Sequence, residues 1–158
     1  MPTPDFVLDL RRRIGTAPLP LVGVTAVIVH EDRVLLGRRS DNGRLTPVTG
    51  IVDPGEEPAD AAVREAWEEA GVVIRAERLV WVHQLPRIVY AHGDQVDYLD
   101  LTFRCVWVSG EPHPVDGEMT EVGWYDLAAL PDLDLGDMHR RIELAFVPDG
   151  AARFEGGR

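Results

Sequence analysis

The stretch that decides the fold is Gly50–Val72, "GIVDPGEEPADAAVREAWEEAGV". Its second part, residues 58–71, predicts a helix, because a proline opens it and a glycine closes it. Three carboxylates, Glu65, Glu68 and Glu69, fall within five residues near the C-terminal end of this helix. Like charges three or four residues apart repel each other, and the helix dipole is itself negative at that end. Such a cluster indicates either a solvated acidic face or a site for a cation.

The helical wheel of this segment separates two faces. Advancing 100° per residue gathers one set of residues into an arc that predicts the core face: Val63, Ala66, Trp67 and Ala70. The three glutamates fall opposite that arc, beside the small Ala61 and Ala62. An acidic face in water is tolerable, because each like-charge contact costs only about 0.3 kcal/mol. A divalent cation would turn the repulsion into attraction, since Mg²⁺ and Mn²⁺ prefer carboxylate oxygens and water.

The fixed positions of the whole stretch resemble the Nudix box, G-x5-E-x7-R-E-U-x-E-E-x-G-U, in which U is apolar. Ala66 and Val72 stand at the apolar positions, and every fixed position matches: Gly50, Glu56, Arg64, Glu65, Glu68, Glu69 and Gly71. The resemblance implies an α/β fold of Nudix type, an α/β/α sandwich with a mixed central sheet. It also implies an enzyme that hydrolyses a pyrophosphate bond in a nucleoside diphosphate linked to another moiety.

The resemblance further implies a divalent metal, Mg²⁺ with Mn²⁺ as a substitute, and a role for each matched residue. By position, Glu65, Glu68 and Glu69 resemble the metal ligands, and Glu56 resembles an accessory ligand. Arg64 resembles the residue that pairs with and orients a box glutamate. Metals would neutralise the phosphates and lower the pKa of bound water, and a nearby carboxylate would accept the proton. One of the box glutamates, or a glutamate outside the box, is the expected general base.

Outside the box, two groups of residues are further candidates. Nudix enzymes often recruit one more glutamate from a loop that corresponds to "DGEMTEVGW", so Glu118 or Glu121 is a candidate base or ligand. Arg38 and Arg39 end a predicted strand, and Arg44 follows in the next loop. A guanidinium can clamp a phosphate through two parallel hydrogen bonds, which makes these arginines candidate substrate ligands. A solvated loop and a solvent-facing basic pair are the alternatives.

The substrate is indicated by the residues that flank the box. Family members that cleave ordinary or oxidised nucleoside triphosphates often carry a tryptophan and a Gly-Gly pair just before it, where this chain has Leu45 and Thr49. ADP-ribose hydrolases often carry a proline about sixteen residues beyond the box glycine, and Pro86 lies fifteen beyond Gly71. We therefore expect a nucleotide-sugar or ADP-ribose-like substrate. The alternatives are a nucleoside triphosphate pyrophosphohydrolase and a catalytically silent domain that senses a nucleotide, although the intact box argues against the second.

Length and charge limit the classes of protein and partner. We expect one Nudix domain over residues 1–158, with residues 1–17 as an N-terminal helical extension. The formal net charge of −11 disfavours binding to nucleic acid and to anionic membranes, because both carry negative charge. A small-molecule nucleotide derivative remains compatible if metal ions and a few arginines contact its phosphates. The family resemblance also allows a homodimer.

We expect a cytoplasmic protein, because the sequence shows no signal-peptide pattern and contains a single cysteine. The N-terminal residues "MPTPDFVLDL" lack a signal-peptide pattern, and the longest apolar stretch is too short to span a bilayer. Cys105 is the only cysteine, which excludes an intrachain disulfide, and its place in the alternating stretch "LTFRCVWV" predicts a buried thiol.

The rest of the chain alternates between strand and helix patterns. A hairpin is expected from residues 21–30 and 33–39, one or two strands from 72–85, and long strands from 95–110 and 121–127. Helices are expected from residues 3–15 and 136–150, with a short helical turn in 126–132. Adjacent long strands together with interleaved helices predict a mixed sheet with helices packed on it.

Overall fold

A computed structural model describes residues 3–133 and 136–157 of the chain. The helices are α1 (Asp5–Ile14), α2 (Pro58–Ala70) and α3 (Met138–Phe146), with a 3₁₀ turn η1 (Leu127–Ala129). The strands are β1 (Leu19–His30), β2 (Arg33–Arg39), β3 (Leu45–Thr46), β4 (Val48–Ile51), β5 (Val73–Gln84), β6 (Ile88–Val89), β7 (Gln95–Ser109), β8 (Met119–Asp126) and β9 (Arg153–Phe154). The expected helices and long strands are therefore confirmed, and residues 72–85 form one strand rather than two.

The strands form one mixed sheet in which β1 is central. The order is β3-β2-β1-β7-β5-β9, while β4 pairs with β1, β6 with β7 and β8 with β2. Strand β1 runs parallel to β7 over eleven residue pairs, whereas β2, β4 and β5 pair with antiparallel neighbours. Strand β4 pairs with the middle of β1, so Gly50, where the Nudix-box stretch begins, lies beside Val24 on the central strand.

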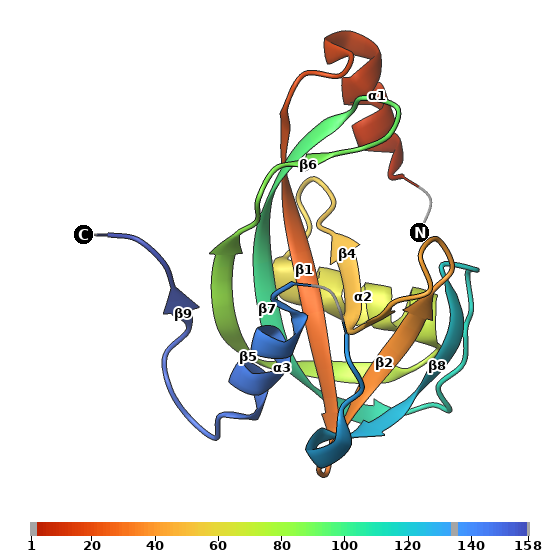
Figure 1. Cartoon of the computed structure of the whole chain (residues 1–158), viewed down its shortest axis with the longest axis vertical. Helices are drawn as coiled ribbons and strands as arrows, with labels where there is room; N and C mark the ends of the chain where they lie inside the picture. Colours follow the sequence, from red (N-terminus) through yellow and green to blue (C-terminus); the bar gives the residue numbers. More distant parts are fainter. Residues whose placement is uncertain (1–2, 134–135, 158) are drawn as a thin grey trace.

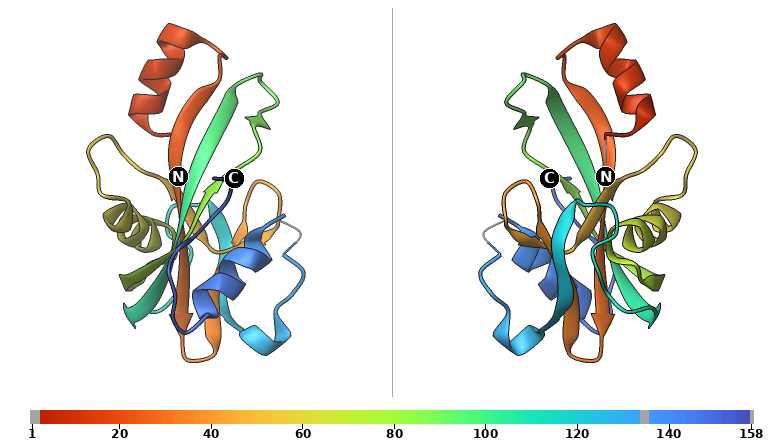
Figure 2. Two further views of the ribbon diagram at one scale, coloured as in Figure 1. Left: turned by 90° about the vertical axis from the view of Figure 1, so that its left-hand side faces the viewer. Right: turned by 90° about the vertical axis from the view of Figure 1, so that its right-hand side faces the viewer.

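The helices cover opposite faces of this sheet, as the two side views in Figure 2 show for α2 and α3. Helix α1 lies at the far end of the molecule, against the extended ends of β1 and β7 (Figure 1). This arrangement confirms the predicted α/β/α sandwich with a mixed sheet. Within the described residues, the structure has no helix long and apolar enough to cross a membrane.

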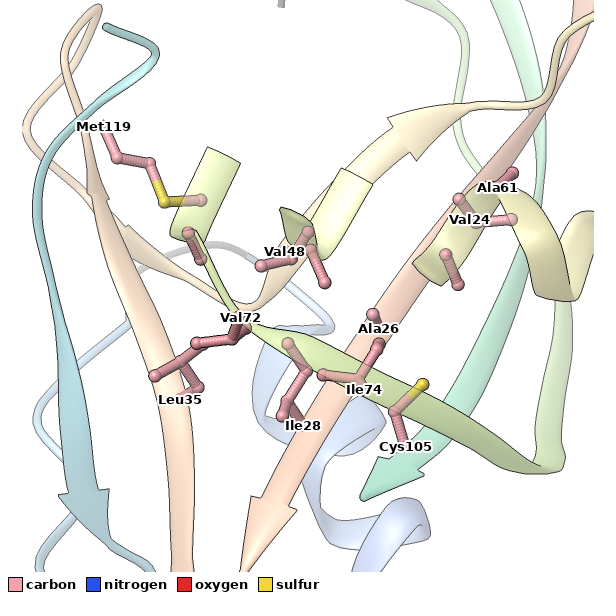
Figure 3. Close-up of a cluster of buried hydrophobic side chains, with 13 residues drawn as sticks. Val24, Ala26, Ile28, Leu35, Val48, Ala61, Val72, Ile74, Cys105 and Met119 are labelled. Carbon is pink, nitrogen blue, oxygen red and sulfur yellow. The ribbon is translucent and has the colours of Figure 1, made fainter. Parts of the chain in front are cut away.

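Helix α2 packs closely on the sheet because the residues that face it are small. Ala61, Ala62, Ala66 and Ala70 are fully buried against aliphatic side chains of β1, β4 and β5, among them Val24, Val48 and Ile74. Figure 3 shows this cluster, which also contains Cys105, as the sequence predicted. A second cluster fills the space between the sheet and α3, and a third, around Val7, fixes α1.

The predicted core face of α2 is confirmed for Ala66 and Ala70, which are fully buried, but it was wrong for Trp67. Trp67, expected in the core, is 59% exposed, whereas Glu65 and Glu69 are 0% and 2% exposed. The buried arc contains four alanines and these two glutamates, so it is displaced from the predicted core arc toward the side that the wheel assigned to water. A count of apolar residues favoured Trp67, but the close approach of helix and sheet requires small side chains there.

Candidate active site

The end of helix α2 is fixed by a glycine. Gly71 has φ +67°, in the left-handed region that favours glycine, and its N–H reaches the carbonyls of Ala66 and Trp67. The chain then enters β5 directly, so the last helical turn, which carries Glu68 and Glu69, cannot unwind without moving the sheet. The local sequence therefore holds these carboxylates in place.

A second glycine makes room for Glu65. A Cβ at Gly50 on β4 would lie 2.2 Å from the Glu65 carboxyl carbon, a separation that real Cβ atoms do not show. Only glycine lets this strand pass so closely over a buried carboxylate. The first glycine of the box and its first helical glutamate are therefore fitted to one another.

Arg64 connects the other box glutamates. Its Nε and Nη2 atoms donate to Glu56 at 2.8 and 2.9 Å, and Nη1 donates to Glu65 at 2.9 Å and to Glu68 at 3.2 Å. Nη2 also donates to the carbonyl of Ile51 at 3.1 Å, which ties the helix to β4. This guanidinium lowers the pKa of Glu56 below its usual value. Arg64 therefore pairs with box glutamates, as the family resemblance implied.

Glu65 and Glu69 are buried without enough partners. Within the part of the chain that the structure describes, Oε2 of each carboxylate accepts no hydrogen bond. Burial raises the pKa of Glu65 to about 7, although Arg64 opposes the shift. Burial, followed by the charge of Glu65, raises the pKa of Glu69 to about 8. Two carboxylates with free oxygens and raised pKa values in one place are typical of a functional site.

A cavity of about 500 Å³ opens beside Glu69 and continues past β1 and β7 toward α1. That volume lies in the usual range for a small-molecule site. Of the residues predicted from the sequence, the described lining includes Arg39, Glu69 and Glu118. It does not include the other predicted residues: Arg38, Arg44, Glu56, Arg64, Glu65, Glu68 and Glu121.

The two predicted strand arginines point to different partners. Arg38 donates to Glu121 at 3.1 Å and to the carbonyl of Gly43 at 2.9 Å, on the exposed surface. Arg39 binds both oxygens of Asp41, at 2.9 and 2.7 Å, yet also lines the cavity. Among the predicted arginines it is thus Arg39 that the structure places beside Glu69.

Among the charged residues that line the cavity, two buried ones were not predicted from the sequence. Asp100 on β7 and Arg141 on α3 are 3% and 2% exposed, and Arg141 Nη1 lies 3.1 Å from Asp100 Oδ1. Burial raises the pKa of Asp100, while Arg141 and two threonine hydroxyls oppose that shift. A signal for Asp100 existed, because its carboxylate stands among apolar and aromatic residues of a predicted strand. Arg141 had none, because Arg140 beside it is the same residue type in a helix.

The comparisons with known proteins agree with this geometry. The model of the family described as NUDIX domain matches residues 19–146. The chain belongs to the Nudix family. The matched range contains α2, the sheet up to β8, and α3, but not α1.

Relatives of this Nudix domain differ in length and in the activity for which they are named. The chain is 33% identical over 112 residues to the NAD-capped RNA hydrolase NudC of Chromobacterium violaceum, covering 69% of this chain and 39% of that protein. A NUDIX hydrolase from Nitrosomonas europaea superposes with a TM-score of 0.70 at 24% identity, covering 85% of this chain and 77% of the other. An ADP-ribose pyrophosphatase from Streptococcus suis 89-1591 superposes with a TM-score of 0.67 at 25% identity, covering 87% and 100%. The chain thus spans about two fifths of its curated relative.

Nudix hydrolases generally use divalent metal ions, so the residues present can be tested for their fit to one. Within residues 3–133 and 136–157, no three His, Cys, Asp or Glu side chains form a ready group of ligands. The donor set nevertheless fits, because Glu65 and Glu69 each keep an unpartnered oxygen. Mg²⁺ is typically held by one or two carboxylates together with water and substrate phosphates rather than by a complete protein cage.

Proposed function

We propose that this Nudix domain hydrolyses the pyrophosphate bond of a nucleoside diphosphate derivative, with Mg²⁺ or Mn²⁺ as its cofactor. The observation that carries the proposal is the pair of buried glutamates on α2, Glu65 and Glu69, which each keep an unpartnered oxygen, and of which Glu69 lines the cavity. Burying such groups is unfavourable unless a cation or proton neutralises them. An acidic chain of net charge −11 also needs cations to bind an anionic substrate.

The metal, when bound, would neutralise the phosphates and activate a water molecule. We propose that Glu65 and Glu69 hold it and that Glu56 and Glu68 support it through the shared contact with Arg64. Arg64 is a positioning residue, because its hydrogen bonds fix one oxygen of Glu65 and leave the other free.

Hydrolysis requires a water oxygen to bond to one phosphorus while the bridging oxygen leaves with its electron pair, and a base takes the water's proton. We propose Glu118 as this base in preference to Glu121, because Glu118 lines the cavity and Glu121 pairs with Arg38 at the surface. Arg39, which also lines the cavity, would bind a substrate phosphate.

The substrate we propose is a nucleotide sugar or an ADP-ribose-like molecule. The likeness to an ADP-ribose pyrophosphatase supports this choice, and NAD, named in the NudC relative, likewise joins two moieties through a pyrophosphate. The cavity volume of about 500 Å³ gives room for a nucleotide. We also propose that the chain is one Nudix domain with residues 1–17 as an extension.

The test is a panel of substrates incubated with the chain and Mg²⁺, with products identified by mass. The panel contains ADP-ribose, nucleotide sugars, NAD, NAD-capped RNA, nucleoside triphosphates and dinucleoside polyphosphates. We expect a nucleoside monophosphate from ADP-ribose or a nucleotide sugar, and no product in excess EDTA. Preferential turnover of a triphosphate would replace the substrate class, and turnover of none with tight binding of one would indicate a sensor.

A further inference from the structure

The cavity floor is a buried ion pair for which the proposed reaction has no use. Arg141 Nη1 and Asp100 Oδ1 are 3.1 Å apart, and both side chains are almost inaccessible. The hydroxyls of Thr25 and Thr102 donate to the two oxygens of Asp100 at 2.9 and 2.8 Å. Burying an ion pair is unfavourable unless additional hydrogen bonds satisfy both partners, so this network has a specific arrangement.

One donor of this network is left over. Arg141 donates from Nη1 to the Thr25 hydroxyl at 2.5 Å and from Nη2 to Asp137 at 3.3 Å. Its Nε–H has no acceptor among the residues that the structure describes, although the side chain is only 2% exposed. Buried N–H groups in proteins nearly always have a partner, and Arg141 lines the cavity. A ligand in the cavity can therefore supply the missing acceptor.

The local charge decides which kind of acceptor fits. The guanidinium of Arg141 faces two carboxylates, Asp100 at 3.1 Å and Asp137 at 3.2 Å. The three groups together carry a charge of −1 when ionised, so a phosphate at this point would be repelled. A neutral acceptor such as a carbonyl oxygen, a ring nitrogen or a hydroxyl meets no such repulsion.

The surrounding wall suits a flat ring. A Cβ placed on Gly23 would lie 3.4 Å from the Tyr98 ring and 3.6 Å from Asp100 Oδ1, so both groups border the same small space. Tyr98, Tyr90 and Ile88 all line the cavity on this side. Aromatic rings stack well on planar groups such as nucleobases.

We propose that Arg141 and Asp100 are specificity-determining residues that bind the nucleoside part of the substrate. Arg141 donates from Nε to a neutral acceptor of the nucleoside, either on the base or on the ribose, while Tyr98 packs against it. The inference rests on the proposed function and adds the position of the nucleoside, against Arg141 and Asp100 in the same cavity that Glu69 lines. It goes beyond the box, since neither residue belongs to it.

The principal test is Arg141→Lys, which keeps a positive charge facing both aspartates but removes Nε and the planar fork. We expect the KM for the preferred substrate to rise roughly tenfold, because a hydrogen bond from a charged group is lost, while kcat stays within about twofold. Arg140→Lys is the matched control, since Arg140 is the exposed neighbour on the same helix and pairs with Glu143. It should change neither constant.

A second variant leaves the ion pair intact. Gly23→Ala adds a methyl group at ordinary contact distances, so the fold should hold, but it fills the space bordered by Tyr98 and Asp100. It should raise the KM as well. Substrates with ribose and 2′-deoxyribose, and with different bases, show which group of the nucleoside supplies the acceptor. The group that Nε contacts is the one whose removal raises the KM of the unaltered chain but not that of Arg141→Lys.

Two results would overturn the inference: a fall in kcat with an unchanged KM in Arg141→Lys, which indicates that the pair merely anchors α3, or no change in either constant. If the unaltered chain hydrolyses no member of the panel, the proposed function fails and the subsite is judged by calorimetric binding of nucleosides. Weaker binding to Arg141→Lys than to Arg140→Lys would support the subsite. Equal binding, or no binding to the unaltered chain, would overturn it.

Discussion

Helix α2 and the cavity floor, the buried pair of Asp100 and Arg141, both bury charged side chains. Among the described residues, however, only the floor gives both oxygens of its carboxylate a partner. Asp100 accepts hydrogen bonds from Thr25 and Thr102, one on each oxygen, and forms an ion pair with Arg141. Glu65 and Glu69 each keep an oxygen to which no described residue donates a hydrogen bond, and burial raises the pKa of both.

The difference separates two uses of a buried charge. A charge paired within the chain contributes to the fold, because removing one partner leaves the other uncompensated. A charge left unpaired is neutralised by a proton or by a cation from solution, and it gains its function at the expense of stability. The following predictions test whether the two regions differ in this way.

The largest effect should follow from Glu69→Gln. We expect kcat on the preferred substrate to fall at least about 100-fold, because a neutral amide is a poor ligand for a divalent ion and cannot accept a proton. Stability measured in EDTA at pH 8 should not decrease, since the amide is easier to bury than a carboxylate. Steady-state kinetics at saturating Mg²⁺ and thermal unfolding in EDTA check both statements.

The control for this substitution is Glu143→Gln on α3, where the carboxylate is exposed and pairs with Arg140. It should leave kcat unchanged. Full activity of Glu69→Gln, with Mg²⁺ still stabilising the fold as before, would show that α2 does not hold the metal.

At the cavity floor, in contrast, we expect a substitution to lower stability. Asp100→Ala leaves Arg141 buried without its nearest countercharge, so the free energy of unfolding should fall by about 3 kcal/mol, with or without metal. Urea denaturation measures the change. Asp97→Ala on the same strand is the control, because Asp97 pairs with Arg87 at the surface and its loss should alter stability little. Equal effects of the two substitutions would contradict the assignment of a stabilising role to the floor.

The pH dependence of stability should come from α2. Glu65 and Glu69 have pKa values of about 7 and 8 in the folded state, above the ordinary value of 4.5. The folded state therefore binds more protons than the unfolded state between about pH 4.5 and 8. The free energy of unfolding in EDTA should then decrease as the pH rises through this window, by on the order of 1 kcal/mol or more.

Magnesium should remove much of this decrease, because it binds the ionised carboxylates and gains affinity as the pH rises. Chemical denaturation at pH 5.5 and 8.5, with EDTA or Mg²⁺, gives the four values needed. The double variant Glu65→Gln/Glu69→Gln should show a flatter profile in EDTA. An unchanged slope in that variant would assign the pH dependence to other groups.

Much of the fold could be predicted from the sequence because its long elements have a strong period. The hairpin of β1 and β2, the long strand β7 and helix α2 were all recognisable in this way. Strands β3, β6 and β9 were not, because each has two residues and exists only by pairing with a neighbour. Two residues carry no measurable periodicity.

The site was predictable where chemistry is local and not where it depends on tertiary contact. The Nudix-box pattern predicted Glu65, Glu69 and Arg64, which lie within six residues on one helix. The contact between Asp100 and Arg141 joins residues 41 positions apart on β7 and α3, and no pattern in either segment predicts it. The contact between Asp100 and Arg141 exists only once β7 and α3 are packed together.

The smallest effect should come from Trp67→Ala. This substitution tests the orientation of α2, on which the burial of Glu65 and Glu69 depends. The helical wheel placed Trp67 in the core, where truncation would lower the free energy of unfolding by about 3–5 kcal/mol. Its side chain is instead 59% exposed, so we expect a loss below about 1 kcal/mol by urea denaturation. Trp81→Ala on β5 is the matched control, because Trp81 is 4% exposed and should show the large loss.

If Trp67→Ala lowered the free energy of unfolding as much as Trp81→Ala, α2 would be rotated in solution. Glu65 and Glu69 would then face water, and neither their raised pKa values nor their need for a cation would follow.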